Sequence, residues 1–321
     1  MRVFVTGANG FIGRTLATRL RSEGHEVSGV DLHAAAGVSA GDVSQAGAWQ
    51  DELAGTDLVL HTAALVSNAP TLEQAWRVNT VGTRHVLDAA VRGGVKRFVY
   101  VSSVRAFSDL GFPDQVSEDH PVRPDGNPYV DSRIATEQVV LQAHAAGELP
   151  VTVVRPGDVY GPGSRPWTLL PLEMIRKRQF FLPAGGKGIF SPVYIDDLVD
   201  GTLLAATHDA GVGQVFTIGG GVGVTCKEFF GHYHRMLGTT GPTTLPTGLA
   251  IALTTAVARG AALAGIETEV NPVAVRYFLR TGTYSIEKAR RLLGHEPRVG
   301  LEEGMARTES WLRGEGLLPT G

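Results

Sequence analysis

Through the first half of the chain, short apolar runs alternate with longer segments whose apolar residues recur at helical spacing. In the first such segment, Phe11, Ile12, Leu16 and Leu20 share one helical face, and Gly24 follows as a C-terminal cap. Strands that are apolar along their whole length are buried on both faces, so the pattern predicts an α/β fold with a doubly wound parallel sheet. The predicted strands are residues 3–6, 27–30, 58–60, 98–101 and 151–154, and the predicted helices are residues 11–23, 72–92 and 128–146.

The pattern becomes irregular after residue 155, because proline and glycine cluster in residues 156–171 and again in 183–192. We therefore expect residues 1–155 to form a dinucleotide-binding domain of the Rossmann type, to which further strands return from about residues 190–220. Residues 156–321 are expected to form a smaller, irregular α/β part that binds substrate and acts as a lid. The predicted elements of this part are a helix at 196–207, a strand at 214–218 and a helix that opens at Thr225.

Residues 248–265 are almost wholly apolar and just reach the length of a bilayer span. Arg259 lies in the middle of the segment, where a charge is costly in lipid. A buried or lid helix is therefore the preferred interpretation, and a weak membrane association stays open.

Composition narrows the class of protein further. The chain has 321 residues, of which 43% are hydrophobic and 19% charged, so it is not a disordered protein. Its formal net charge of -3 argues against a nucleic-acid partner. Cys226 is the single cysteine, which excludes a disulfide framework and any cysteine-rich metal site, so no metal is expected. No signal-peptide pattern is present, and a cytoplasmic protein is expected.

A glycine-rich turn connects the first strand to the first helix. In the run from Thr6 to Gly13, Gly7, Gly10 and Gly13 permit a sharp turn, close approach of a pyrophosphate and packing of helix on strand. The helix N-terminus adds unpaired N–H donors. The alternative is an ordinary tight turn between a strand and a helix. The cofactor contacts predicted at this turn are Gly7, Asn9, Gly10, Phe11, Ile12 and Gly13.

Asp31 closes the second strand, 18 residues after Gly13, and Leu32 follows it; both are predicted cofactor contacts. A carboxylate at this place accepts hydrogen bonds from the adenosine ribose and repels a 2′-phosphate, so NAD is the predicted cofactor rather than NADP. The alternative role for Asp31 is to cap the end of the strand. His33 could reduce the preference for NAD over NADP.

A tyrosine and an arginine lie one turn apart on the helix predicted at 128–146. Tyr129 could supply the proton that carbonyl reduction needs, and the cationic Arg133, four residues later, could lower the tyrosine pKa. Ser102 and Ser103 close the fourth strand, at the sheet edge where this fold places its chemistry. A tyrosine and an arginine that merely share a surface helix are the structural alternative.

These motifs, in this order, resemble the extended short-chain dehydrogenase/reductase family of the NAD-dependent epimerase/dehydratase type. The resemblance implies a catalytic set of Ser103, with Ser102 as its backup, Tyr129 and Arg133. The family carries lysine where this chain has Arg133, which excludes a proton relay through a titrating amine. The further cofactor contacts that the resemblance implies are Asp42, Val43, Ala63, Ala64, Asn79, Tyr129, Arg133 and Pro156.

The substrate side resembles the 3β-hydroxysteroid dehydrogenase and dihydroflavonol-reductase-like branches. Phe190 occupies the place where nucleotide-sugar enzymes of the family carry a phosphate-binding arginine. The predicted function is therefore hydride transfer between NAD and a hydroxyl or ketone of a largely apolar small molecule. The predicted substrate contacts are Val104, Asp158, Trp167 and Phe190.

Two alternative functions and one expectation about oligomeric state stand beside this prediction. Arg165 and Arg280 could bind phosphate, which would suit a nucleotide-sugar epimerase or dehydratase. The arginine at position 133 is also compatible with a catalytically weak NAD-binding regulatory protein. The family resemblance further implies a homodimer through the helices at 72–92 and 128–146.

Overall fold

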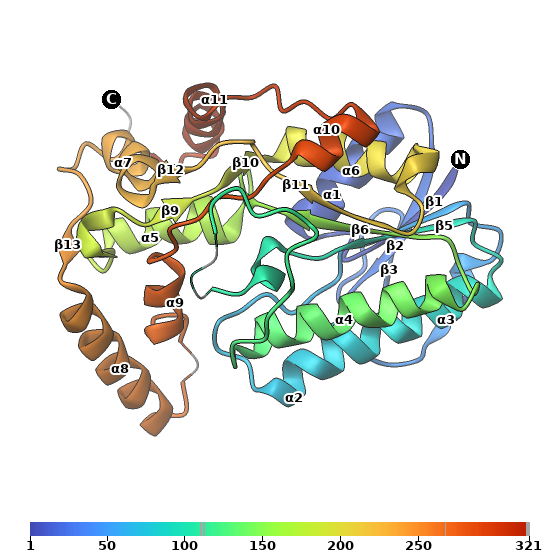
Figure 1. The fold of residues 1–321 in the computed structure, drawn as a ribbon, viewed down its shortest axis with the longest axis horizontal. Helices are drawn as coiled ribbons and strands as arrows, with labels where there is room; N and C mark the ends of the chain where they lie inside the picture. The colour runs from blue at the N-terminus through green and yellow to red at the C-terminus, as the bar shows by residue number, and fades with distance from the viewer. Residues whose placement is uncertain (110, 112, 267, 319–321) are drawn as a thin grey trace.

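A seven-stranded parallel sheet forms the centre of the fold (Figure 1). The computed structural model describes residues 1–109, 111, 113–266 and 268–318. Along the sheet the strand order is β11-β6-β5-β4-β1-β2-β3, and it reverses direction between β1 and β4. The predicted doubly wound sheet is thus confirmed. Its strands are β1 (Arg2–Thr6), β2 (Glu26–Asp31), β3 (Val38–Ala40), β4 (Leu58–His61), β5 (Arg97–Val101), β6 (Val151–Pro156) and β11 (Gln214–Ile218).

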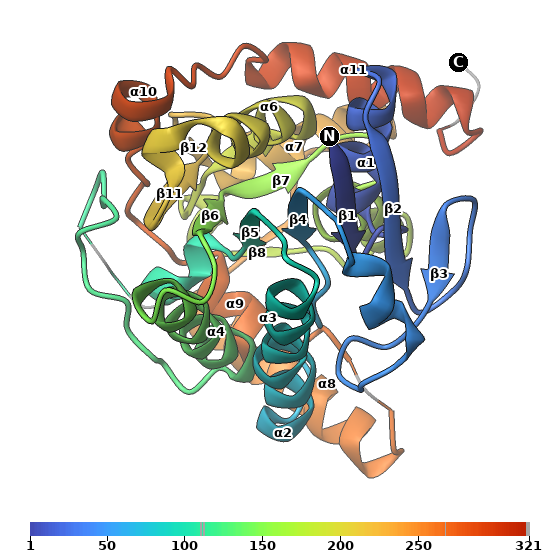
Figure 2. The same cartoon turned by 90° about the vertical axis from the view of Figure 1, so that its right-hand side faces the viewer.

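Helices cover both faces of the sheet, as Figures 1 and 2 show from two directions. Alternate residues of β1 reach opposite layers: Val3 and Val5 pack with Leu16 and Leu20, whereas Phe4 packs in the other layer with Val86. This burial on two sides explains why the strands read as continuous apolar runs. One layer contains α1 (Phe11–Ser22), α6 (Ile195–Thr207), α10 (Glu287–Leu293) and α11 (Leu301–Gly314), and the other contains α2 (Leu72–Ala75), α3 (Gly82–Arg92) and α4 (Pro128–Ala145).

The helix predicted at 72–92 is continuous but not uniform. Between α2 and α3 the chain forms a π-helical segment, η2 (Trp76–Val81), which contains Asn79. A π-helical turn inside an α-helix is rare and is often found at a functional site.

The rest of the chain after residue 156 lies beyond the carboxyl ends of the sheet strands, on the side of Figure 1 opposite the N-terminus. The predicted strand at 214–218 returns to the sheet as β11, and the Thr225 hydroxyl caps α7 by accepting from Glu228 N at 3.1 Å. The helices beyond the strand ends are α5 (Leu170–Arg176), α7 (Cys226–Met236), α8 (Thr247–Leu263) and α9 (Pro272–Tyr277). Short strands pair as β7 (Asp158–Tyr160) with β10 (Pro192–Tyr194), β9 (Ile189–Phe190) with β12 (Val224–Thr225), and β8 (Leu182–Pro183) with β13 (Thr244–Leu245). Further short helical turns are η1 (Ala48–Leu53), η3 (Val104–Phe107), η4 (Arg165–Leu169), η5 (Ala184–Gly186) and η6 (Asp209–Gly211).

Most of the apolar segment at 248–265 forms α8, which is largely exposed rather than buried, so of the expected buried or lid helix only the lid stays a prediction. Only Ala250 and Thr254 are buried in this helix, and Leu249, Leu253 and Leu263 are exposed. The helix is apolar around most of its circumference but contacts the rest of the chain along one narrow face. Within the described residues, no helix combines the length and the hydropathy that a bilayer crossing requires.

Candidate active site

The glycine-rich turn has the backbone geometry that a bound pyrophosphate needs. Gly7 has a φ of 67°, and a Cβ there would lie 2.8 Å from the Ala63 backbone nitrogen. A Cβ at Gly13 would lie 2.2 Å from the Gly7 carbonyl oxygen, so helix and turn touch directly. Gly10 caps α1 without a side-chain hydrogen bond, and the first turn carries no acidic residue. The first N–H groups of α1 are therefore available to donate hydrogen bonds to an anionic group.

Asp31 lies beside this turn at the end of β2. Its Oδ2 accepts from Asn9 N at 2.9 Å and its Oδ1 accepts from Leu32 N at 2.7 Å. The Asn9 side chain donates to His33 O at 2.6 Å, which joins the turn to the segment after β2. Each carboxylate oxygen keeps further acceptor capacity. Asp31 and the turn together suit the ribose and the pyrophosphate of a dinucleotide, at the point where the strand order reverses.

The other predicted cofactor residues lie near the same sheet edge. Asp42 accepts from Ser44 N at 2.8 Å, and Val43 is buried in the sheet core. Ala63 N donates to Thr6 Oγ1 at 3.2 Å, next to the glycine-rich turn. Ala64 follows Ala63, and Pro156 closes β6. Cofactor contacts for these residues stay predictions.

The Asn79 amide connects three segments around the site through hydrogen bonds. It accepts from Leu65 N at 2.8 Å and donates to Ser132 Oγ at 2.9 Å and Leu65 O at 3.3 Å. The π-helical segment is thereby tied to the loop after β4 and to α4. Asn79 is buried, and both of its amide N–H groups donate within the protein, which gives it a supporting role in the fold; a cofactor contact for Asn79 stays a prediction.

Helix α4 presents Tyr129 and Arg133 to the carboxyl edge of β5. Asn127 caps the helix by accepting from Tyr129 N at 3.0 Å, and Pro128 occupies the first turn. The guanidinium carbon of Arg133 lies 5.1 Å from the centre of the Tyr129 ring. The four-residue spacing thus brings phenol and cation together, as the sequence predicts for one helical face.

Two cations and a hydroxyl surround the Tyr129 phenol. Burial raises the pKa of the phenol, but the charges of Arg133 and Arg105 and hydrogen bonds with Arg133 and Ser103 lower it by more. The net result is a Tyr129 pKa below its ordinary value. A lowered pKa increases the fraction of phenolate near neutral pH, and the phenolate is the form that accepts a proton.

Arg133 is buried, yet one of its donors is unused. Its Nη1 donates to Tyr100 OH at 2.9 Å and to Val101 O at 3.4 Å. Its Nε has no hydrogen-bond partner among the described residues. An unpaired buried N–H is costly, so this donor suits a hydroxyl supplied by a bound molecule. The site residues therefore fit a nicotinamide dinucleotide.

The two serines after β5 differ in what they can do. Ser102 is buried and its Oγ donates to Glu137 Oε1 at 2.6 Å, in a buried ion pair between Glu137 and Arg155. Ser103 is partly exposed, and its Oγ accepts from Arg105 N at 3.2 Å while interacting with the Tyr129 hydroxyl. Ser103 is thus the serine with a hydroxyl available to a substrate, and Ser102 is committed to the ion pair beneath the site.

Asp158 belongs to a buried network that its predicted role did not anticipate. Arg280 donates to Asp158 Oδ2 at 2.9 Å, Ser191 N donates to the same oxygen at 2.9 Å, and the Tyr277 hydroxyl donates to Oδ1. Arg280 also donates to Tyr277 O and to Tyr284 OH. Neither charge is available to a substrate in this arrangement, so Asp158 joins β7 to α9 instead of facing a ligand.

The apolar residues predicted to contact substrate differ in burial. Phe190 is 0% exposed and packs against Trp167 and Phe229, with ring centres 4.9 and 4.1 Å apart. Val104 is buried with Phe107 below the site. Trp167 is only partly buried, so it is the best placed of the three for direct contact, and Phe190 supports it from behind.

Two residues at the site carry no signal in the sequence. Arg105 and Tyr100 contact Tyr129 and Arg133, respectively. Tyr100 lies within an apolar strand and Arg105 within a short turn, and neither position stands out in the linear pattern.

The predicted phosphate ligand Arg165 is exposed, and its Nη1 lies 3.6 Å from Oε1 of Glu173.

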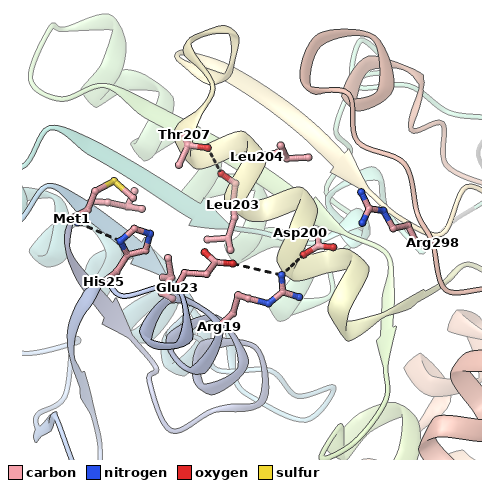
Figure 3. A pocket seen from close by; sticks show the side chains of 11 residues that line it. Met1, Arg19, Glu23, His25, Asp200, Leu203, Leu204, Thr207 and Arg298 are labelled. Carbon is pink, nitrogen blue, oxygen red and sulfur yellow. Dashed lines mark hydrogen bonds and ion pairs between the residues drawn. The ribbon is translucent and has the colours of Figure 1, made fainter.

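A hollow of about 370 Å³ opens at the other end of the sheet (Figure 3). Met1 and Leu58 line it at the amino ends of β1 and β4, and Arg19 pairs with Asp200 at 2.8 Å across it. None of the predicted cofactor or catalytic residues lines this hollow.

Comparison with known proteins agrees with this geometry. Residues 3–219 match the NAD dependent epimerase/dehydratase family. The chain belongs to this family. Membership confirms the predicted resemblance, the NAD-dependent enzyme class and the cofactor, because the family is defined by NAD dependence.

Relatives within this family act on different substrates. The chain is 31% identical to the 4-hydroxy-2-methyl-3-oxo-4-farnesyl-3,4-dihydroquinoline-1-oxide ketoreductase of Stigmatella aurantiaca, over 99% of each chain. It is 30% identical to a UDP-glucose 4-epimerase of Mycolicibacterium smegmatis, over 98% of this chain and 99% of that one. It is 29% identical to a 3-beta-hydroxysteroid dehydrogenase of Mycolicibacterium neoaurum, over 95% and 89%.

Among solved structures, MoeE5 in complex with UDP-glucose and NAD superposes with a TM-score of 0.79 and 28% identity, over 98% of this chain and 99% of that one. The family's fold therefore extends over nearly the whole chain, including the C-terminal part.

Proposed function

We propose that this protein transfers a hydride between NAD and the hydroxyl or ketone of a largely apolar small molecule, with Tyr129 giving or taking the proton. The observation that carries the proposal is the meeting of Ser103, Tyr129 and Arg133 at the carboxyl edge of β5, where the Tyr129 pKa is lowered. Carbonyl reduction and alcohol oxidation both need a group that can hold a proton next to the reacting oxygen.

Each residue of this set has a distinct task. Bound NAD supplies or accepts the hydride. The Tyr129 phenol donates its proton to the substrate oxygen in reduction and takes it back in oxidation. Ser103 supplies a second hydrogen bond to that oxygen, and Arg133 favours the phenolate and offers its unused Nε to a ribose hydroxyl. Arg133 keeps its own proton throughout, because a guanidinium does not titrate at working pH.

An apolar substrate is supported by two positions, one where the cation is paired within the protein and one where an aromatic residue replaces it. Arg280 is buried against Asp158, and Phe190 fills the place of a phosphate-binding arginine with an aromatic side chain. The partly buried face of Trp167 would present an apolar surface. The ketoreductase and the hydroxysteroid dehydrogenase named above, which are similar along most of their length, support the same class of substrate.

A nucleotide sugar is the second candidate. It is supported by the similarity to the UDP-glucose 4-epimerase and to MoeE5 with UDP-glucose. This function would require a diphosphate ligand other than Arg280, and the exposed Arg165 is the remaining candidate of the two predicted from sequence.

A substrate panel separates the candidates. Steroid, aryl and prenylated alcohols and ketones are incubated with NAD or NADH, and turnover is followed by NADH absorbance. UDP-sugars are assayed by chromatography of the product sugar, because an epimerase returns the hydride and leaves no net NADH. We expect turnover with an apolar substrate and none with UDP-sugars. Turnover of UDP-sugars alone would replace the proposal by the second candidate, and NADH binding without any turnover would favour a regulatory protein.

The homodimer implied by the resemblance stays a prediction. Leu72 and Trp76 are exposed on the helix that would form the interface. Light scattering of the purified protein would measure the oligomeric state.

A further inference from the structure

A second guanidinium faces Tyr129 from a different element. Arg105 lies in η3, two residues after Ser103. Its guanidinium carbon is 5.1 Å from the centre of the Tyr129 ring and 5.0 Å from that of Tyr277 in α9. Its side chain is only 11% exposed, so the charge lies between two aromatic rings, largely out of water.

Every nitrogen of this guanidinium has an acceptor. Nε donates to Asp109 Oδ1 at 2.9 Å, Nη2 donates to Asp109 Oδ2, and Nη1 donates to Asn68 Oδ1 at 2.9 Å. A two-pronged pair with a carboxylate fixes both the distance and the plane of an arginine. Arg105 is therefore held in place rather than free to swing toward a ligand.

The partners of Arg105 also hold the beginning of the catalytic helix. Asn127, which caps α4 at Tyr129 N, donates through Nδ2 to Asp109 Oδ2 at 3.4 Å. Asp125 accepts from Asp109 N and from Asn127 N, each at 2.9 Å. One connected set of hydrogen bonds thus runs from Arg105 to the backbone of Tyr129.

The backbone next to this set is strained. Ser108 has a φ of 84°, a value that side-chain-bearing residues rarely adopt. Its Oγ donates to Asp125 Oδ2 at 3.0 Å, which helps to hold this conformation. Such strain persists where surrounding contacts over-determine the geometry, often at functional sites. The turn at Ser108 brings the Asp109 carboxylate back onto Arg105.

We propose that Arg105 is a positioning residue of the active site: a second fixed cation that, with Arg133, favours the phenolate of Tyr129 and fixes its ring against α9. The inference rests on the proposed role of Tyr129. It also bears on the arginine at position 133, because Arg133 shares its guanidinium among Tyr129, Tyr100 and the Val101 carbonyl instead of directing it at Tyr129 alone. A second cation restores part of the positive charge that a compact ammonium would concentrate at the phenol.

The charges around Tyr129 set the size of the expected effect. Arg133 and Tyr100 face it from α4 and β5, and Ser103 and Arg105 from the segment after β5. Tyr277 of α9 lies across Arg105, and Asp109 opposes the Arg105 charge. Because Arg105 is partly neutralised, its removal should shift the Tyr129 pKa by about one pH unit, the lower end of the range for a close charge.

The test is a titration that needs no substrate. Tyrosinate absorbance in the near ultraviolet is recorded against pH for the full chain, and the same curve for Tyr129→Phe is subtracted, so the difference reports Tyr129. The subtraction is repeated in the Arg105→Gln and Asp109→Asn backgrounds. Arg105→Gln should raise the Tyr129 pKa by about one pH unit. Asp109→Asn should lower it, because it removes the negative charge that opposes Arg105. Arg105→Lys, which keeps a charge, should shift it less than Arg105→Gln.

Arg84→Gln is the matched control. Arg84 pairs with Asp88 four residues away, as Arg105 does with Asp109, but on the exposed side of α3. It should leave the Tyr129 transition unchanged. Thermal melting identifies a variant that fails to fold, and Asp109→Asn then carries the test through the sign of its shift.

Shifts of opposite sign in the two variants support the proposal. An unchanged Tyr129 transition in folded Arg105→Gln overturns it, and so does an unchanged transition in Asp109→Asn. Because the titration is independent of turnover, a lowered Tyr129 pKa in a protein without activity would refute the proposed function and leave this inference standing.

Discussion

Arg133 is anchored to Tyr100, because its Nη1 donates a 2.9 Å hydrogen bond to the Tyr100 hydroxyl. Tyr100 is buried in β5, and burial raises the pKa of its phenol, so this hydroxyl stays neutral and remains an acceptor for Arg133. The sheet therefore fixes the cation that faces Tyr129. Arg133, which replaces the usual lysine of the family, is held by its hydrogen bond to Tyr100 of β5.

This anchoring predicts different results for two substitutions of Arg133. Arg133→Ala removes the charge beside Tyr129 and the unused Nε donor, so NADH binding should weaken by about tenfold or more, and the rate should fall as well. Arg133→Lys keeps the charge and should retain most of the binding, with some loss of rate because the planar fork is lost. Fluorescence titration with NADH and steady-state rates check both. Equal binding by Arg133→Ala and the unmodified protein would contradict the assignment.

Asp31 should decide between the two dinucleotides. NAD should bind at least tenfold more tightly than NADP, about 1.4 kcal/mol or more, because the 2′-phosphate would face this carboxylate. Asp31→Ala should narrow the difference mainly by admitting NADP. Calorimetric titration of both cofactors measures this, and equal affinities in the unmodified protein would refute the prediction.

The buried pair of Glu137 and Arg155 should contribute to stability rather than to chemistry. The two side chains are 1% and 5% exposed and lie 2.7 Å apart beneath the site. Glu137→Gln leaves a buried guanidinium without its counter-charge, which should cost about 3–5 kcal/mol of unfolding free energy in a denaturant titration. Glu309→Gln, which breaks the exposed pair with Arg313, should cost less than about 1 kcal/mol. Similar losses for the two variants would contradict the structural role.

Binding of nucleotide sugars should be undetectable. With Arg280 committed to Asp158 and Phe190 in the place of a cation, the diphosphate would lie against apolar surface. Calorimetry with UDP-glucose in the presence of NAD checks this. An affinity tighter than about 1 mM would favour the nucleotide-sugar candidate and direct attention to Arg165.

The fold of the first half follows closely from local pattern. The strands β1, β4, β5 and β6 are largely apolar, whereas β2 is mixed, and the glycine-rich turn lies between a strand and a helix in the linear order. The β3 strand has only three residues, too few for a periodic signal. The π-helical segment at Trp76–Val81 is also invisible, because one extra residue in a turn hardly disturbs an apolar pattern.

The site could be predicted where its residues share an element and could not where they meet across the fold. Tyr129 and Arg133 are four residues apart on α4, so their proximity follows from helix geometry. The ion pair of Asp158 with Arg280 joins residues 122 positions apart, which made each look like a free ligand in the sequence. The sequence gives no sign that Arg105 is buried, because its contacts with Tyr277 of α9 and with Asn68 form only in the folded chain.

The most direct test of the account is the pH dependence of substrate oxidation with Tyr129 present and absent. Oxidation needs the phenolate, so the rate should rise with pH and level off above an apparent pKa lower than the ordinary tyrosine value near 10. Tyr129→Phe should lose about 10²–10⁴-fold in rate and lose this transition, while NADH binding stays nearly intact. A Tyr129→Phe variant that keeps both the rate and the pH transition would contradict the assignment of Tyr129 as the proton-transferring group.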